Sequence, residues 1–194
     1  MSATNRGTIR VESDFYATPL ETVYALLDNY EDIAPTDIIL EPSAGNGNII
    51  QALRNRGYKN RIDAIELRDS EYDNLKDLAD NIEITDFLDL DPWHSRYNVI
   101  IGNPPYSLAQ EFIDKSLELL APGGRLIFLL RTNFLESKKR FEWWQDKTPT
   151  GLYVLSKRPS FTGKGTDATS YSWFIWEKSR IVNEFIRYQE IRVI

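Results

Sequence analysis

The chain has 194 residues, of which 42% are apolar and 27% are charged, and its formal net charge is −6. This composition predicts one globular domain over residues 1–194, and the longest aliphatic runs are too short to span a bilayer. Cysteine is absent and histidine occurs once, which excludes disulfides and cysteine zinc sites and disfavours a His-rich metal cage or a Ser-His-Asp triad. We therefore expect no metal site. The polar start lacks the apolar core of a signal peptide, so a cytoplasmic protein without membrane contact is expected.

Charge is unevenly divided along the sequence. Residues 1–100 carry 9 basic and 19 acidic side chains, whereas residues 101–194 carry 14 basic and 10 acidic ones. The basic surplus is concentrated in residues 131–165, with 8 basic and 3 acidic side chains. This segment could hold a polyanion or simply form a solvated basic face. The acidic total argues against tight non-specific binding to nucleic acid at physiological salt.

The first half of the chain alternates between apolar runs of strand length and helical patterns, which predicts an α/β fold with a mostly parallel sheet. The first helix is expected to begin near Thr18, with Thr18 as the N-cap, Pro19 in the first turn and Glu21 closing a capping box. We expect strands at 37–40, 61–67, 82–85 and 97–103, and helices at 48–57 and 70–80.

The second half continues this alternation. We expect helices at 107–124 and 137–147, and strands at 125–130, 151–155 and 170–178, of which the last two would form a hairpin pair. The intervening loop, 156–170, is too long for a tight hairpin, and loops of this length are often functional or mobile. Residues 178–194 fit no single pattern and are left without an expected element.

Three successive strand ends carry side chains suited to a nucleotide-like ligand. In open parallel sheets, ligands bind beyond the carboxyl ends of the strands. After the first strand, Gly45 and Gly47 allow the backbone to approach a ligand closely. Glu66, after the second strand, is positioned to accept hydrogen bonds from a ribose diol. Asp86 and Phe87, after the third strand, could hold an adenine through its exocyclic amine and its flat face.

The spacing of the glycines at 44–47 and the acidic side chains at the strand ends indicate which kind of nucleotide-like ligand would bind. Residues 44–47 read AGNG and lack the longer GxGxxG spacing, which disfavours a dinucleotide pyrophosphate. Glu41 adds another acid at the end of the first strand, and acids disfavour phosphate. They suit a ligand that carries ribose, adenine and a positive charge, and S-adenosylmethionine combines all three. Each feature alone also fits an ordinary strand end or turn, so this interpretation depends on their occurrence at successive strand ends.

A second motif, Asn103-Pro104-Pro105-Tyr106, directly follows the fourth expected strand. The prolines fix φ and remove two N–H donors, and Asn103 is pushed towards an extended conformation. The loop therefore presents rigid carbonyl acceptors, to which Asn103 adds a side-chain acceptor. Such acceptors could grip the N6 amine of adenine and free its lone pair for methyl transfer, while Tyr106 stacks on the base. The alternative is a Pro-Pro turn that only ends a strand.

In this order, the motifs resemble those of class I S-adenosylmethionine-dependent N6-adenine DNA methyltransferases. The resemblance covers roughly residues 14–130, and the NPPY motif at 103–106 is its most specific part. It implies a Rossmann-like class I methyltransferase fold, with a seven-stranded, mostly parallel sheet and an antiparallel last strand. It also implies methyl transfer from S-adenosylmethionine to adenine N6 in DNA, with the target base flipped out of the duplex.

The resemblance assigns a role to each site residue. Segment 14–19 would contact the methionine part of the cofactor, and 158–166 loosely resembles a late loop whose aromatic residue packs the flipped base, although Phe161 could equally be a loop anchor. The expected cofactor-binding residues are Tyr16, Thr18, Glu41, Pro42, Ser43, Gly45, Gly47, Glu66, Leu67, Asp86, Phe87 and Asn103. The expected catalytic residues are Asn103, Pro104, Pro105 and Tyr106. The expected substrate-binding residues are Tyr106, Phe161, Lys138, Lys139, Arg140 and Lys164.

One departure from the family concerns target recognition. Restriction-type relatives usually carry a large separate recognition domain, whereas only about 60 residues follow the fifth expected strand here. Three explanations remain open: loops recognise a short target sequence, a protein partner supplies the recognition, or the substrate is not duplex DNA. The basic segment with Trp143 and Trp144 is the candidate surface. Alternative functions are methylation of RNA adenine or protein glutamine, and a non-catalytic cofactor-binding subunit of a larger complex.

Overall fold

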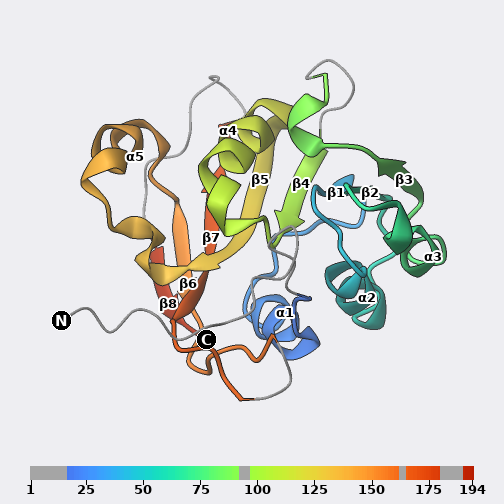
Figure 1. The fold of residues 1–194 in the computed structure, drawn as a ribbon, viewed down its shortest axis with the longest axis horizontal. Coiled ribbons are helices and arrows are strands. Elements are labelled where there is room, and N and C mark those ends of the chain that lie inside the picture. Colours follow the sequence, from blue (N-terminus) through green and yellow to red (C-terminus); the bar gives the residue numbers. More distant parts are fainter. Residues whose placement is uncertain (1–16, 92–96, 162–164, 180–189) are drawn as a thin grey trace.

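The computed structural model describes residues 17–91, 97–161, 165–179 and 190–194. Within these ranges, eight strands form one mixed sheet in the order β3-β2-β1-β4-β5-β7-β6-β8 (Figure 1). The strands are β1 (Ile39–Glu41), β2 (Ile62–Glu66), β3 (Asn81–Ile84), β4 (Tyr97–Gly102), β5 (Leu120–Arg131), β6 (Gly151–Val154), β7 (Tyr171–Glu177) and β8 (Glu190–Val193). The expected α/β fold with a mostly parallel sheet is confirmed.

Strand β7 is antiparallel to both of its neighbours, β5 and β6, while the other pairs are parallel. The expected antiparallel direction of the seventh strand and its hairpin with β6 are therefore correct. The expected count of seven strands is wrong, because β8 pairs in parallel with β6 and ends the chain's strand order. This strand has only four residues, alternates charged with apolar side chains, and exposes 72% of both Ile191 and Val193, so it lacks the buried run that marks the other strands.

Helices cover both faces of the sheet (Figure 1). They are α1 (Leu20–Leu27), α2 (Asn48–Asn55), α3 (Tyr72–Leu75), α4 (Ala109–Leu119) and α5 (Phe141–Lys147). The apolar side chains of α1, α2 and α3 pack with Val99, Ile101 and their neighbours on one face of the sheet. Those of α4 and α5 pack with Ile100 and its neighbours on the other face. This separation follows from the two-residue alternation of side chains along a strand.

Three expected helices differ from the structure. The first begins at Leu20 with Pro19 as the N-cap residue, so Thr18 is not its N-cap. The expected helix over 70–80 is reduced to α3 and one preceding 3₁₀ turn, because this polar segment has a single fully buried anchor, Leu75. Helix α4 ends at Leu119, shortly before the Pro-Gly-Gly at 122–124 that was expected to stop it, but these three residues belong to β5 and not to the end of the helix. No helix in the described ranges is long and apolar enough to cross a membrane.

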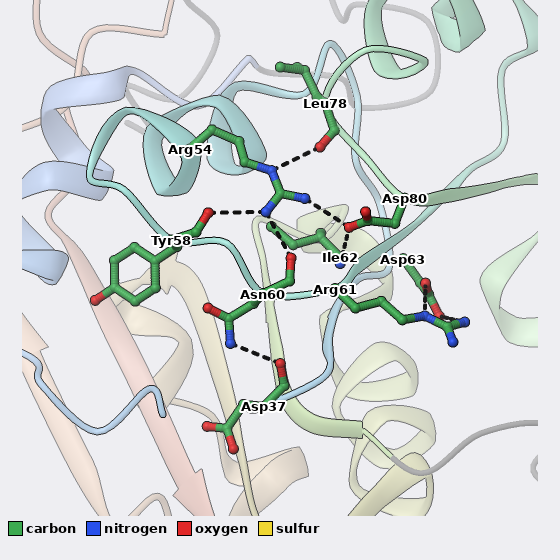
Figure 2. A network of polar contacts seen from close by, with 9 residues as sticks. All are labelled: Asp37, Arg54, Tyr58, Asn60, Arg61, Ile62, Asp63, Leu78 and Asp80. Atoms are coloured by element: carbon green, nitrogen blue, oxygen red, sulfur yellow. Dashed lines mark hydrogen bonds and ion pairs between the residues drawn. The ribbon is translucent and has the colours of Figure 1, made fainter. Parts of the chain in front are cut away.

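Arg54 joins the loops at the amino ends of the strands (Figure 2). Its guanidinium donates to the carbonyl oxygens of Tyr58, Asn60 and Leu78 at 2.8 to 3.1 Å and pairs with Asp80 at 2.9 Å. The Asp80 carboxylate also accepts from the backbone N–H of Ile62 at 2.8 Å. Arg54 thereby supplies hydrogen-bond donors to loop carbonyls that lie outside the regular bonding of strands and helices. This network fixes the edge of the sheet that lies opposite the strands' carboxyl ends.

Candidate active site

A pocket lies beyond the carboxyl ends of β1, β2, β3 and β4. It contains roughly 800 Å³ of space, part of which is open to solvent. The expected site residues that line it are Thr18, Glu41, Pro42, Ser43, Gly45, Glu66, Leu67, Asp86, Phe87, Asn103 and Pro105. The expected residues from five separate segments are therefore brought together in one cavity.

The turn between β1 and α2 forms the floor of this pocket. Gly45 and Gly47 both have positive φ, +56° and +80°, which favours glycine at each position. Gly45 lines the pocket, whereas Gly47 does not. A Cβ on Gly47 would lie 2.8 Å from Leu78 Cδ1 and 3.1 Å from Leu75 Cδ2. Gly47 therefore allows the start of α2 to pack closely on the α3 segment, and it supports the turn from behind.

Glu66 connects that turn to the end of β2. Its Oε2 accepts a 2.7 Å hydrogen bond from the backbone N–H of Gly45, and its Oε1 accepts from Arg68 Nε at 2.8 Å. Glu66 is only 5% exposed, and Arg68 also pairs with Glu71 at 3.3 Å. The carboxylate thus fixes the glycine turn, while Arg68, which the sequence motifs did not indicate, balances its charge at the pocket wall.

Glu41 is the most buried acid of the pocket, with 2% of its surface exposed. Among the described residues, its Oε2 has no hydrogen-bond partner. Burial and the neighbouring Glu66 carboxylate raise the pKa of Glu41 well above its usual range, and a bond to the backbone of Ile50 opposes this shift. A buried carboxylate oxygen at a pocket wall is complementary to an amino or other cationic group.

Asp86 and Phe87 form the wall after β3. One Asp86 oxygen accepts from the backbone N–H of Leu88 at 2.9 Å, which caps the 3₁₀ turn Phe87–Asp89. The buried Phe87 ring lies 4.9 Å from the ring of Phe112 on α4. Leu67 lines the pocket opening and is 60% exposed. This wall combines an apolar surface with one carboxylate, as an adenine site would require.

Asn103 occupies the junction of three segments at the end of β4. Its Nδ2 donates to Thr18 Oγ1 at 3.1 Å, and its backbone oxygen accepts from Ser43 Oγ at 3.4 Å. Asn48, which the motifs did not indicate, donates through Nδ2 to the backbone oxygen of Thr18 at 2.8 Å. The Thr18 hydroxyl is therefore engaged with Asn103 rather than with a helix N-terminus, which explains why the expected cap is wrong.

Glycine at position 102 permits this junction to be close. A Cβ there would lie 3.2 Å from Pro42 Cδ and 3.3 Å from Phe128 Cε1. The loop that follows is held by the backbone N–H of Leu108, which donates to Pro105 O at 2.9 Å in the 3₁₀ turn Tyr106–Leu108. Pro104 is buried. A glycine directly before the NPPY motif is the sequence feature that indicates this close packing of the strand end against Pro42 and Phe128.

Tyr106 faces a second space. It lines a neighbouring hollow together with Ala109, Arg131, Asn133 and residues of the 134–140 segment, and it does not line the pocket at the strand ends. Its ring centroid lies 5.8 Å from that of Tyr171, and the Arg131 guanidinium carbon lies 5.1 Å from its centroid. Burial raises the pKa of Tyr106. Consecutive residues of the NPPY loop thus border two adjoining cavities.

Phe161 is connected to Tyr106 through Tyr171. The Phe161 and Tyr171 centroids are 5.1 Å apart with an interplanar angle of 64°. Tyr171 also hydrogen-bonds to Asp167 Oδ2 at 3.2 Å, which anchors the long loop between β6 and β7. Three aromatic rings therefore form a continuous row that begins in the NPPY loop. Of the remaining expected site residues, Tyr16 and Lys164 lie outside the described residues.

The basic cluster is divided by the structure. Lys138 and Lys139 are exposed and line neither cavity. Arg140 borders the hollow, donates to Phe134 O at 2.8 and 3.1 Å, and lies over the Phe134 ring at 4.4 Å. Trp143 and Trp144, the candidate recognition surface, are half-buried against the β7 face of the sheet. Both tryptophans are therefore partly buried, whereas the alternative arrangement would have one buried and the other exposed at the rim.

Two curated sequences are similar to the chain. The type II methyltransferase M.CvrRI of Paramecium bursaria Chlorella virus XZ-6E is 33% identical over 150 residues, covering 66% of this chain and 39% of the relative. M.AccI, a type II methyltransferase of Acinetobacter calcoaceticus, is 24% identical over 153 residues, covering 63% and 28%. The chain thus spans about a third of the length of these relatives. No protein-family model matches it.

Solved methyltransferases share the arrangement of strands and helices described above. The M protein of the type I restriction enzyme EcoKI superposes with a TM-score of 0.69 at 16% identity, covering 93% of this chain and 48% of that one. The fold is that of the class I S-adenosylmethionine-dependent methyltransferases. The expected resemblance to class I DNA methyltransferases is confirmed, and S-adenosylmethionine, the expected cofactor, is the one after which this fold family is named.

Proposed function

We propose that this methyltransferase-fold chain transfers a methyl group from S-adenosylmethionine to the N6 amine of adenine in DNA. One observation carries the proposal: the Asn103–Tyr106 loop borders the large pocket with Asn103 and the neighbouring hollow with Tyr106. A loop in that position can hold an amino group at the boundary between a bound cofactor and a bound base. The similarity to two type II methyltransferases supports DNA as the substrate.

The residues of the large pocket fit S-adenosylmethionine. Glu41, with an unpartnered buried oxygen among the described residues, is suited to its amino group, and Glu66 to its ribose hydroxyls. Asp86 and Phe87 are suited to its adenine through a carboxylate acceptor and a ring face. When bound, the cofactor supplies a methyl group activated by a positive sulfonium. The acids of this pocket favour such a cation electrostatically.

The NPPY loop would prepare the nucleophile. Asn103 Nδ2 is engaged by Thr18, and this assigns Oδ1 as the atom that accepts from the amine. Pro104 contributes a carbonyl acceptor and no competing N–H. With both amine hydrogens held by these acceptors, the N6 lone pair would be directed at the methyl group that the cofactor supplies, and the surplus amine proton would pass to solvent. The loop acts by positioning and electrostatics, without a strong base.

Domain organisation and target recognition extend this proposal. We propose that residues 1–194 form one methyltransferase domain, and that recognition of the target sequence comes from loops beside the hollow or from a protein partner. Half-burial of both tryptophans in the basic segment supports this view, because it leaves only part of each ring for contact with a strand. The base would be flipped out of duplex DNA at a cost of a few kcal/mol, which stacking on Tyr106 would partly offset.

Methyl transfer can be tested with the purified chain and S-adenosylmethionine labelled in its methyl group. Duplex DNA, single-stranded DNA and RNA are offered in parallel and digested to nucleosides. We expect label in N6-methyladenine from DNA. Label only in RNA would identify RNA as the substrate instead, and no label despite cofactor binding would indicate a non-catalytic subunit.

Asn103→Ala is the variant that tests the chemistry. We expect methylation to fall by at least roughly a thousandfold, because removal of a preorganised acceptor costs several kcal/mol in the transition state. Cofactor affinity, measured by calorimetry, should change little. Asn55→Ala is the matched control, because the Asn55 side chain bonds with Gln51 and Tyr24 on the exposed side of α2 and does not line the pocket. Unchanged turnover in Asn103→Ala would disprove the mechanism.

A further inference from the structure

The hollow beside Tyr106 carries positive charge that the proposed chemistry does not use. Arg131, at the end of β5, and Arg140 both line it, and Asn133 adds an amide. Within the part of the chain that the structure describes, no carboxylate lines it. The space is roughly 540 Å³ including open solvent, so it is large enough to admit a group of several heavy atoms. In a chain of net charge −6, two guanidinium groups at one hollow mark a local anion site.

Arg131 is held in place by groups that leave its charge available. Its Nε donates to the Tyr171 hydroxyl at 3.4 Å, and Tyr171, which is 1% exposed, donates to Asp167 Oδ2 at 3.2 Å. Asp167 also acts electrostatically on Arg131, but among the described residues the two side chains form no ion pair. Within the described residues, Arg131 forms no salt bridge, and only its Nε has a hydrogen-bond partner. Its two terminal nitrogens are the donors that remain for a ligand.

Arg140 completes the site from the opposite side. Its Nε and Nη2 are occupied by the backbone oxygens of Phe134 and Glu136, and its guanidinium is stacked on the Phe134 ring. These bonds fix the loop after β5 and hold a second positive charge near the hollow. The two arginines therefore differ: Arg140 is mainly an anchor that adds charge, while Arg131 presents a fork of donors that matches a phosphate.

We propose that Arg131, assisted by the charge of Arg140, binds a backbone phosphate of the nucleic-acid strand next to the target adenine. This inference rests on the proposed function. Tyr106 lines the same hollow and is the expected stacking partner of the base, so the sugar-phosphate linkage of that nucleotide must pass nearby. A phosphate contact carries no sequence information but fixes the register of the strand. Arg131 is thus a positioning residue for the base that Asn103 holds.

The test compares two forms of a labelled oligothymidylate with one central adenine, each as single strand and as duplex. One form has normal linkages, and the other has uncharged methylphosphonate linkages on both sides of the adenine. We expect the wild-type chain to bind the charged form about tenfold more tightly, and Arg131→Gln to lose this preference. The slope of log affinity against log salt should fall by about 0.7 to 0.9, the value for one lost phosphate contact.

Arg56→Gln is the matched control, because it removes one arginine that pairs with Asp28 at the far end of α2, at 2.7 Å. It should keep both the preference and the salt slope. Arg131→Lys, which retains the charge but not the fork, should recover part of the preference. Unchanged cofactor binding shows that each variant is folded. If Arg131→Gln does not fold, the wild-type comparison of the two oligonucleotides still decides the question.

Failure of this inference can be separated from failure of the proposed function. If the wild-type chain methylates DNA but binds both oligonucleotide forms equally, or if Arg131→Gln keeps the preference, the phosphate site is disproved and the methyltransferase proposal stands. If the wild-type chain neither binds the oligonucleotides nor methylates any nucleic acid, both are disproved. A preference present in wild type and Arg56→Gln but absent in Arg131→Gln supports the phosphate site.

Discussion

At the scale of single residues, the pocket combines two acids that are held in opposite ways. The two carboxylate oxygens of Glu66 accept hydrogen bonds from Gly45 and Arg68, so the charge of Glu66 is balanced within the protein. Glu41 is buried beside it, and its Oε2 has no partner in the part of the chain that the structure describes. The first acid stabilises the fold of the turn. The second lowers the stability of the ligand-free protein and becomes favourable only when a cation is bound.

Glu41 should therefore give the ligand-free protein a specific pH dependence. Because burial and Glu66 raise the pKa of Glu41, the folded state binds a proton more readily than the unfolded state. Stability should fall as the pH rises above the ordinary carboxylate range, until the folded pKa is passed. In Glu41→Gln this contribution disappears. Thermal unfolding of both proteins across this pH range measures the difference.

The same substitution should weaken cofactor binding by at least about tenfold, because the charged partner of the amino group is lost. Calorimetry at neutral pH provides the value. Parallel pH profiles for the unfolding of wild type and Glu41→Gln would contradict the burial argument, whatever the affinity.

Thr18 offers a second test at the residue scale. Thr18→Val keeps the shape of the side chain but removes the oxygen that accepts from Asn103 Nδ2. We expect kcat to fall about tenfold, or about 1.4 kcal/mol, with cofactor affinity nearly unchanged, because the amide of Asn103 loses its orientation. Thr18→Ser retains the oxygen and should restore most of the rate. Equal loss in the serine variant would point to packing instead of positioning.

At the scale of elements, the packing of α2 on α3 depends on one missing side chain. Gly47 begins α2 with a left-handed φ of +80°, and the side chains of Leu75 and Leu78 fill the space that a Cβ would need. Gly57, just after α2, has a similar φ of +84° but nothing within 4 Å of a built Cβ. Two glycines therefore flank α2 with similar left-handed φ values, but only Gly47 lies against neighbouring side chains that a Cβ would meet.

Alanine at these two positions separates the two effects. Gly57→Ala should lower the free energy of unfolding by about 1 kcal/mol from backbone strain alone. Gly47→Ala adds overpacking and should cost about 2–4 kcal/mol. Because the glycine turn also lines the pocket through Gly45, cofactor affinity should fall in Gly47→Ala only. Denaturant unfolding supplies both values, and equal losses would show that the close contact is relieved at no cost.

At the scale of the whole molecule, features encoded by local sequence patterns can be predicted, whereas contacts between distant segments cannot. The strand ends from β1 to β4 and their motifs were expected, and the structure brings most of these residues into one pocket. The hollow beside Tyr106 was not expected, because Arg131 and Tyr171 meet through the register of β5 with antiparallel β7. They are 40 residues apart, and no local periodicity encodes that register. Strand β8 was missed because it is short and exposed.

The charge division of the sequence also has a structural meaning. The acidic first half supplies the strand ends that carry Glu41, Glu66 and Asp86, whereas the basic second half supplies Arg131 and Arg140. The boundary between the halves lies near the NPPY loop, at residues 103–106. A cationic cofactor and an anionic strand would thus approach this loop from sides of opposite potential.

The Arg54 network has a consequence for how this protein can change over generations. It secures the loops on one rim of the sheet, and every contact proposed for cofactor and nucleic acid lies on the other rim. Sequence change at the rim that carries the strands' carboxyl ends would therefore leave the contacts made by Arg54 intact.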